Sequence, residues 1–300
     1  MKTILNSIAT GSMLAMLALA QPQRTIESAL SRQVPHGHDT YASANRSLLV
    51  YAITGNLQFG LLELQSGAFL PIGPDLPPNV GGGLVPGRGK SLVTLAFSGD
   101  LVAIDPINGT TSLVGPTGLG DCSTSASPCG PNSANVIGRH EGSLYATDFA
   151  NNLYSVDPKS GAAKLIGPTG MPALPFIPLS TGPNGTNVYN ESLFSVRGKL
   201  YANFAAGVLQ PGGPPAIVIP PALYQIDPKT GQATRIAATD FGLASIVTVN
   251  DTVYGLKAST GQVVTLDVDT GQTSPVSDLD PAARLIGGAT PARVVPEDRD

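Results

Sequence analysis

The sequence predicts an all-β fold, a β-propeller of about five or six four-stranded blades, and three observations carry this prediction. The segment at 222–237, ALYQIDPKTGQATRIA, has copies that begin at Leu101, Asn152 and Val263, and a degenerate copy begins at Phe59. Repeats of this kind indicate an architecture built from one supersecondary unit. The composition, with 35 Gly and 27 Pro, suits short strands joined by tight turns. The two chain ends also complement each other, as described below.

Each complete repeat reads as four short strands. In the first, residues 81–87, 91–97, 101–106 and 111–115 are rich in Leu, Val and Ala, and turns that contain glycine separate them. Further complete units cover 134–167, 191–237 and 243–277. The four-stranded unit is typical of a propeller blade.

The ends of the repeat region predict how the ring closes. Strand structure begins near Asn45, but the hairpin region that follows it lacks the first strand of a unit, whereas 282–295 resembles only that strand. We therefore expect 282–295 to supply the inner strand of the blade that begins near Asn45. This pairing removes the edges that an open array would leave exposed, and it brings the count to about five blades.

The amino terminus predicts export. Lys2 precedes an apolar stretch at 8–20 that ends Ala-Leu-Ala, as in a secretory signal peptide. We expect a signal peptide at 1–20, a flexible arm at 21–44, the propeller at 45–295 and a tail at 296–300. No later stretch of about 18 apolar residues lacks Gly, Pro or charge, so we expect no membrane span and a secreted protein, extracellular or periplasmic.

Charge and cysteine content narrow the partners further. With a net charge of −4 and only 13% charged residues, the chain is a poor match for nucleic acid. Cys122 and Cys129 lie in a short polar loop, and in an exported protein this favours a disulfide. The alternative, a redox pair, lacks the C-x-x-C spacing.

The long connections all belong to one face of the predicted propeller. Because strands alternate in direction, the connections from second to third strand and from blade to blade share a face. The long ones are 116–133, 168–190 and 205–221. Loops on a rigid framework commonly carry function, so this face is expected to present a binding surface.

The most repeated motif, Asp-Pro-x-Thr/Ser-Gly, is predicted to be a structural turn. The carboxylate of Asp227 can accept backbone N–H bonds, Pro228 fixes φ and Gly231 permits positive φ. Asp105, Asp157 and Asp267 should act likewise. A calcium loop at Asp267 and Asp269 is disfavoured because Gly271 stands where an oxygen ligand is needed.

Other reactive patterns are weak. Residues 83–91 resemble a phosphate loop, but Leu84 replaces the spaced glycine and no helix follows. Two histidines in the arm, His36 and His38, are weak evidence for a metal site. His140 lies in a predicted turn beside charged residues, which indicates a solvated side chain.

The mouth of the central channel supplies the candidate ligand-binding residues. Aligning the repeats places Gly83, Asn135, Glu191 and Ala244 at one level, which is not a ring of metal ligands. Two residues at the ends of second strands, Asp148 and Lys257, add polar groups near this mouth, although solvation at the edge explains them more simply. The candidate ligand-binding residues are thus Asn135, Asp148, Glu191 and Lys257, with no catalytic residue assigned and no metal or cofactor expected.

The pattern LYxIDPxTGxxxxIG, seen at 153–167 and 223–237, resembles the secreted β-propellers with NHL-like or quinoprotein-like repeats. The resemblance implies four-stranded blades around a channel, with ligand or protein binding at one face. Trp is absent from the chain, which sets it apart from WD-repeat, Asp-box and tryptophan-docked quinone enzymes. No catalytic position carries over from the resemblance.

The function predicted from the sequence is an exported, noncatalytic binding module that presents its long loops to a protein or carbohydrate ligand, with no nucleic-acid partner and a monomeric state. The alternative is a metal-dependent propeller hydrolase or lactonase with its site at the central mouth. A second alternative is a structural protein of the cell wall or matrix.

Overall fold

The computed structural model of the chain describes residues 48–78, 80, 83–121, 130–172, 186–209, 216–240, 243–257, 260–281 and 286–292. At 186–191, 207–209, 216–218 and 286–287 it describes the backbone alone. The predicted signal peptide (1–20), arm (21–44) and tail (296–300), together with His36, His38, Cys122 and Cys129, lie outside the described residues. Within the described part of the chain, no helix has the length and apolar character needed to cross a membrane.

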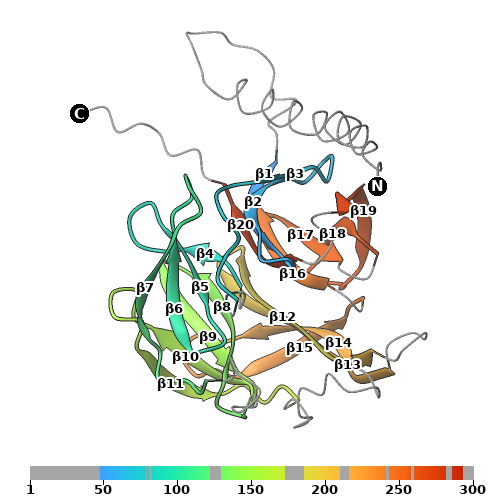
Figure 1. Cartoon of the computed structure of the whole chain (residues 1–300). Helices are drawn as coiled ribbons and strands as arrows, with labels where there is room; N and C mark the ends of the chain where they lie inside the picture. The colour runs from blue at the N-terminus through green and yellow to red at the C-terminus, as the bar shows by residue number, and fades with distance from the viewer. Residues whose placement is uncertain are drawn as a thin grey trace, which may run out of the picture.

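The described residues form twenty strands in five four-stranded antiparallel sheets arranged as a ring, so the predicted propeller is confirmed with five blades (Figure 1). From the axis outward, blade 1 contains β20 (Ile286–Pro291), β1 (Leu49–Thr54), β2 (Phe59–Glu63) and β3 (Phe69–Pro71). Blade 2 contains β4 (Val85–Pro86), β5 (Leu92–Leu95), β6 (Asp100–Ile104) and β7 (Thr111–Pro116). Blade 3 contains β8 (Ala134–His140), β9 (Ser143–Asp148), β10 (Asn152–Val156) and β11 (Ala163–Pro168).

Blade 4 contains β12 (Thr186–Val196), β13 (Lys199–Leu209), β14 (Ala216–Ile226) and β15 (Ala233–Ala238). Blade 5 contains β16 (Leu243–Val249), β17 (Thr252–Lys257), β18 (Gln262–Leu266) and β19 (Thr273–Asp278). The four places in each blade are named A to D from the axis outward. The A–B face carries the A–B and C–D turns, and the B–C face carries the B–C turns and the connections between blades.

The ring closes as the sequence predicts. The last strand, β20, pairs antiparallel with β1, with Tyr51 opposite Thr290 and Ala52 opposite Ala289. The A strands contact one another in the order β20, β4, β8, β12, β16 and back to β20. Closure therefore joins segments more than 200 residues apart in the chain and covers the inner edge of β1.

Glycines let the five A strands approach one another closely. A Cβ added to Gly288 would lie 2.6 Å from the carbonyl carbon of Gly83, and one added to Gly138 would lie 2.7 Å from the carbonyl oxygen of Leu193. Real Cβ atoms do not approach backbone atoms so closely, so these positions accept only glycine without a shift of the strands. Glycine in a strand commonly marks such a close approach of two backbones.

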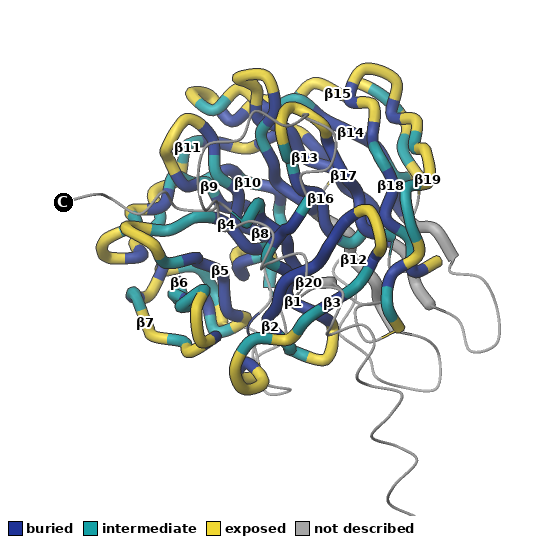
Figure 2. The backbone as a smooth tube through the Cα atoms, turned by 90° about the horizontal axis from the view of Figure 1, so that it is seen from above, coloured by how far each residue is buried: buried dark blue, intermediate teal, exposed yellow. Residues whose placement is uncertain are grey.

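The core consists of five apolar clusters, one in each interface between neighbouring blades. Between blades 2 and 3, for example, Leu95 and Leu101 of one blade pack with Ile137 and Leu144 of the next. Burial is greatest near the axis, and the outer strands and turns are exposed (Figure 2). The blades are therefore held together mainly by burial of apolar surface between sheets.

The repeated Asp-Pro-x-Thr/Ser-Gly motif forms the C–D turn, as predicted. In blade 4 the carboxylate of Asp227 accepts the Lys229 backbone N–H at 2.9 Å and the Thr230 hydroxyl at 2.9 Å. Gly231 has φ of 83°, and a Cβ there would lie 2.8 Å from the carbonyl oxygen of Gly167 in blade 3. The glycine thus serves both the turn and the contact with the preceding blade. Asp105, Asp157 and Asp267 accept backbone N–H bonds in the same way.

A second repeated motif, Gly-Pro-Thr-Gly at the end of strand D, also joins blades. The Thr169 hydroxyl donates to the Asn151 carbonyl in the B–C turn of its own blade at 2.7 Å. The Thr169 carbonyl accepts the Ala233 N–H of the next blade at 2.8 Å. Thr117 makes the equivalent bonds to Gly99 and Ala163. Each buried threonine therefore links three segments of the ring.

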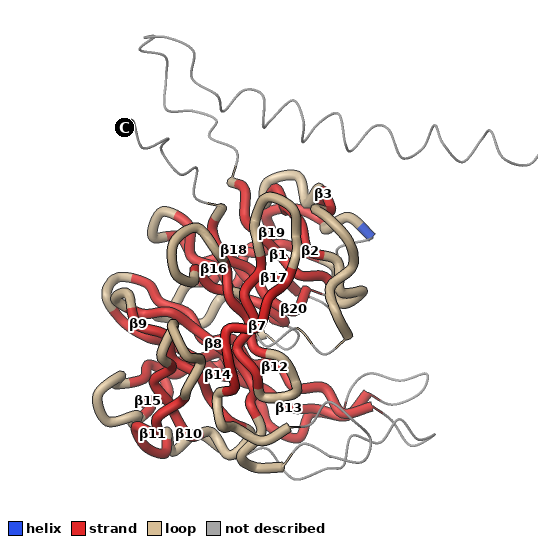
Figure 3. Tube along the Cα trace, turned by 60° about the vertical axis from the view of Figure 1, so that its left-hand side comes forward, coloured by secondary structure: helices blue, strands red, loops and turns tan. Residues whose placement is uncertain are grey.

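Blade 4 departs from the prediction of loops at 168–190 and 205–221. Residues 186–190, 205–209 and 216–221 belong to strands, because β12, β13 and β14 each have eleven residues. Thr186 pairs with Leu209 and Gly207 with Ile217. The strand pattern is broken in sequence at Pro220 and Pro221, which cannot donate to the ladder, and the pairing shifts register there. These three segments are named the blade-4 arm, and β12 and β13 extend from the body of the ring in Figure 3.

Candidate functional site

The predicted site residues do not gather at one point. Asn135 lies in β8 at a β-bulge, where the register of the pairing with β9 shifts between Ala134 and Val136. Ala244 occupies the same kind of bulge in β16. The backbone of Glu191 pairs with Phe204 in the blade-4 arm's base, and its side chain is not described. The strand starts are thus aligned in the backbone, but the described side chains at these positions do not form a polar cluster.

Asp148 is a buried structural group, where the sequence indicated a solvated one. Its carboxylate accepts the backbone N–H of Asn152 at 2.8 Å, the side-chain amide of Asn152 at 2.9 Å and the hydroxyl of Tyr154 at 2.8 Å. These bonds close the β9–β10 turn. Burial, followed by the hydrogen bond to Asp148, raises the pKa of Tyr154 to about 12. With its acceptors in use, Asp148 stabilises the turn and is not directed at a ligand.

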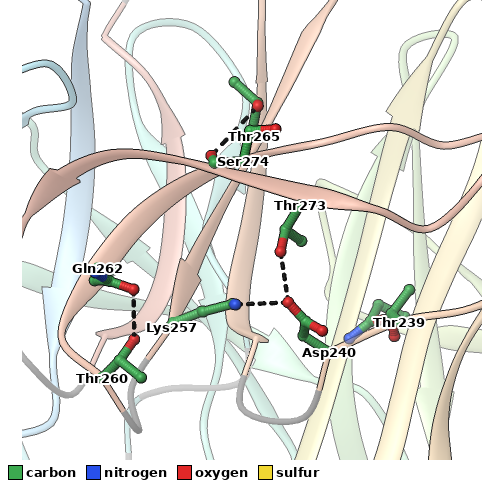
Figure 4. Close-up of polar contacts among 9 residues, drawn as sticks. Thr239, Asp240, Lys257, Thr260, Gln262, Thr265, Thr273 and Ser274 are labelled. Carbon is green, nitrogen blue, oxygen red and sulfur yellow. Dashed lines mark hydrogen bonds and ion pairs between the residues drawn. The ribbon is translucent and has the colours of Figure 1, made fainter.

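Lys257 is likewise committed to a partner within the fold. Its ammonium donates to the carboxylate of Asp240 at 2.6 Å, and the Thr273 hydroxyl donates to the same oxygen (Figure 4). Only 15% of the Lys257 side chain is exposed. The hydrogen bonds from Lys257 and Thr273 lower the pKa of the Asp240 carboxyl. This cluster ties the β15–β16 connection to strands B and D of blade 5.

The central channel contains a cavity of about 390 Å³, and all five A strands line it. Its walls run from Gly83, Ser192 and Ser245 to Glu141 and Gly142 in the β8–β9 turn. The Glu141 side chain is 74% exposed, so this end of the cavity reaches solvent at the A–B face. None of the four predicted ligand-binding residues belongs to its lining.

The cavity wall combines polar and apolar surface, and several side-chain hydroxyl groups belong to its polar part. Ser192, Ser195, Ser245, Thr248 and Thr290 all contribute to the lining. Arg139 adds a guanidinium, whose Nη1 donates to the carbonyl oxygen of Pro86 and to that of Gly87 at 3.1 Å. Thr248 Oγ1 is buried and has no hydrogen-bond partner. The alignment of the strand starts missed this set because Ser192 and Ser245 come one residue after the aligned Glu191 and Ala244. Ser195, Thr248 and Thr290 lie farther along the A strands.

His140 is buried beside the cavity, where the sequence indicated a solvated turn residue. Its Nδ1 lies 2.8 Å from Ser195 Oγ, and that hydroxyl donates to the Lys199 carbonyl at 3.1 Å. The His140–Ser195 contact joins β8 to β12 and therefore cross-links blades 3 and 4.

The structure offers no metal centre among the side chains it describes. No three His, Cys, Asp or Glu side chains of the described residues lie close enough together to hold an ion. On the A–B face, Asp251, Asp267 and Asp269 line a groove together with Arg197. The Arg197 guanidinium lies 3.6 Å from the Asp269 carboxylate.

Comparison with known proteins gives only structural likeness. No protein-family model matches the chain, and no curated protein matches it. Three solved structures are similar to it at low identity. A chain of a nidogen/laminin complex is 14% identical with a TM-score of 0.46, the match covering 81% of this chain and 97% of that one.

The second is a structural genomics protein of unknown function from Bacteroides thetaiotaomicron, which is 16% identical with a TM-score of 0.44. The match covers 86% of this chain and 64% of that one, so this chain spans less than two thirds of that protein's length. The third is the PQQ-bound aldose sugar dehydrogenase of Streptomyces coelicolor, 13% identical with a TM-score of 0.42, covering 74% and 87% of the two chains. What the chain's own sheets establish is the fold: the described residues form a five-bladed β-propeller.

Proposed function

We propose that the protein is an exported, noncatalytic binding module and that the blade-4 arm is its binding surface. The observation that carries this proposal is the length of three adjacent strands. β12, β13 and β14 have eleven residues each, whereas the strands of the other four blades have two to seven. The extra length has no counterpart in the repeat and lies at the B–C end of the blade.

The backbone of the blade-4 arm suits recognition of an extended peptide segment. β15 pairs with β14 from Ala222 to Ile226, and the Thr239 N–H that follows β15 donates to the Pro221 carbonyl at 3.2 Å. Among the described residues, 216–220 therefore has a paired strand on the β13 side alone. An edge of this kind can add a strand from another chain. Pro220 and Pro221 remove two N–H donors from it, which limits pairing to the part beyond them.

The composition of the arm agrees with a binding role. None of the residues 186–190, 205–209 and 216–221 carries a charge. Isolated edge strands are commonly protected by charged side chains, and the centres of protein interfaces are depleted in them. The absence of charge therefore favours contact of this projecting sheet with a protein partner over permanent exposure to solvent.

Shortening the arm tests this function. In the variant, Asn-Gly replaces 207–218, so that β13 and β14 join by a two-residue hairpin directly after the paired residues Ala206 and Ile219, which belong to the core and are kept. The mature protein and the variant would be screened against arrays of extracellular proteins and glycans. We expect a protein ligand that binds the mature chain and loses at least about tenfold in affinity with the variant, while the melting temperature of the propeller changes little.

The matched control is Lys159→Ala, a change in a C–D turn on the A–B face, which should bind like the unmodified protein. Equal binding by the arm-shortened variant would contradict the assignment of the arm. Turnover of a substrate by the mature protein would contradict the noncatalytic function.

A further inference from the structure

The cavity in the central channel is separate from the blade-4 arm and calls for its own explanation. At about 390 Å³ it falls at the lower end of the range for small-molecule sites, about 300–1,000 Å³, and is too small for a macromolecular segment of any length. It reaches the A–B face, whereas the arm projects from the B–C face. A ligand here would therefore be bound independently of one held by the arm.

A guanidinium without an ion pair points to an anionic group. Arg139 and Glu141 are the charged residues that line the cavity. The Glu141 side chain is 74% exposed at the A–B end, and none of the described ion pairs joins Arg139 to a carboxylate. The described bonds of its guanidinium run through Nη1 to two carbonyls of blade 2. These bonds fix the position of the group while the guanidinium keeps further N–H donors, a geometry suited to a carboxylate.

The hydroxyl groups point to a ligand that itself carries hydroxyls. Ser192, Ser245 and Thr290 are nearly buried in the wall, and Thr248 adds a hydroxyl oxygen that has no partner. A buried polar atom without a partner is unfavourable, and in native proteins such atoms commonly belong to functional sites. Thr248 Oγ1 is itself buried, so a ligand hydroxyl reaches it when the side chain rotates about its Cα–Cβ bond toward the cavity. A polyol would then supply the partner that an apolar ligand lacks.

We propose that the central channel binds a small hydroxylated carboxylate, of the size of a hexuronic acid, through the A–B face. Arg139 holds the carboxylate, and Thr248 and the neighbouring hydroxyls bind the ligand's hydroxyl groups. The two requirements act together: a neutral sugar lacks the group that Arg139 binds, and a simple carboxylate such as acetate lacks the hydroxyls.

Titration of the mature protein with D-glucuronate, D-glucose and acetate, followed by ligand-observed NMR and calorimetry, tests the assignment. We expect saturable binding of glucuronate at one site, at least about tenfold tighter than binding of glucose or acetate. Arg139→Gln should weaken glucuronate binding by about tenfold or more, because it removes a charge-assisted contact. The control, Arg88→Gln, removes an exposed charge from the same face outside the cavity and should leave binding unchanged.

A second variant keeps the test decisive even where Arg139→Gln fails to fold. Thr248→Val replaces the unpartnered hydroxyl by a methyl group of the same shape, so the free protein should melt at the same or a higher temperature. The affinity for glucuronate should nevertheless fall. Absence of glucuronate binding at millimolar concentration, or binding that neither variant weakens, would overturn the proposal.

Discussion

At the scale of single residues, position in the packed ring decides what a side chain does. Asp148 and Lys257 occupy equivalent places in two repeats, yet Asp148 is bonded to Tyr154 of its own blade and Lys257 to Asp240 in the connection from blade 4. Both polar groups thus stabilise connections on the B–C face. Their chemistry was visible in the sequence, but their partners lie up to 17 residues away and become known only when the strands are paired.

Tyr154 provides a prediction at this scale. Burial and the hydrogen bond to Asp148 raise its pKa from 10.0 to about 12, so the neutral phenol is favoured in the folded state. The stability that this group contributes is complete below pH 10 and is lost as the pH rises through about 12. Absorbance titration at 295 nm should show a tyrosine ionising near pH 12 that is missing in Tyr154→Phe.

The control for this titration is Asp148→Asn, which removes the carboxylate and should lower the pKa of Tyr154. Identical alkaline titrations of Tyr154→Phe and the unmodified protein would refute the role given to the Tyr154–Asp148 bond.

At the scale of strands and turns, the repeated elements were predictable and the unique ones were not. The C–D turn follows from local rules, since Asp227, Pro228 and Gly231 have fixed roles within five consecutive positions. In the blade-4 arm, Gly207, Pro220 and Pro221 interrupt the strand pattern, so the sequence predicts loops there. Its strands are held by pairing between 186–190 and 205–209, which no local pattern reveals.

The glycines of the turns allow a matched pair of substitutions. Gly231 and Gly170 both have positive φ, 83° and 75°, but a Cβ would meet the Gly167 carbonyl oxygen at 2.8 Å in the first and nothing within 4 Å in the second. Gly170→Ala should cost roughly 1–2 kcal/mol of unfolding free energy for the backbone conformation alone. Gly231→Ala should cost about 1–3 kcal/mol more, because the blades must also shift.

Denaturant unfolding of the two variants measures this difference. Equal losses of stability would show that the contact between the C–D turn and the preceding blade is unimportant.

At the scale of the whole molecule, repeated residues hold the ring together, whereas the proposed binding sites belong to features that do not repeat. The repeated residues form turns, inter-blade contacts and core. The features that do not repeat are the blade-4 arm and the central cavity. The complementary chain ends predict about five blades and leave a sixth open, and the structure has five. The face at which the cavity opens could not be predicted from the sequence. It depends on how Arg139, Thr248 and Thr290, from three different blades, pack around the axis.

The arrangement of all five blades depends on closure of the ring by the last strand, and a truncation tests this closure directly. A chain that ends at residue 285 lacks β20, whereas a control that ends at 292 retains it. We expect the shorter chain to lose most of its stability and to expose the edge of β1. A peptide of residues 284–294, but not a scrambled one, should bind the shorter chain and raise its melting temperature. A shorter chain as stable as the control, with no response to the peptide, would contradict the closed ring.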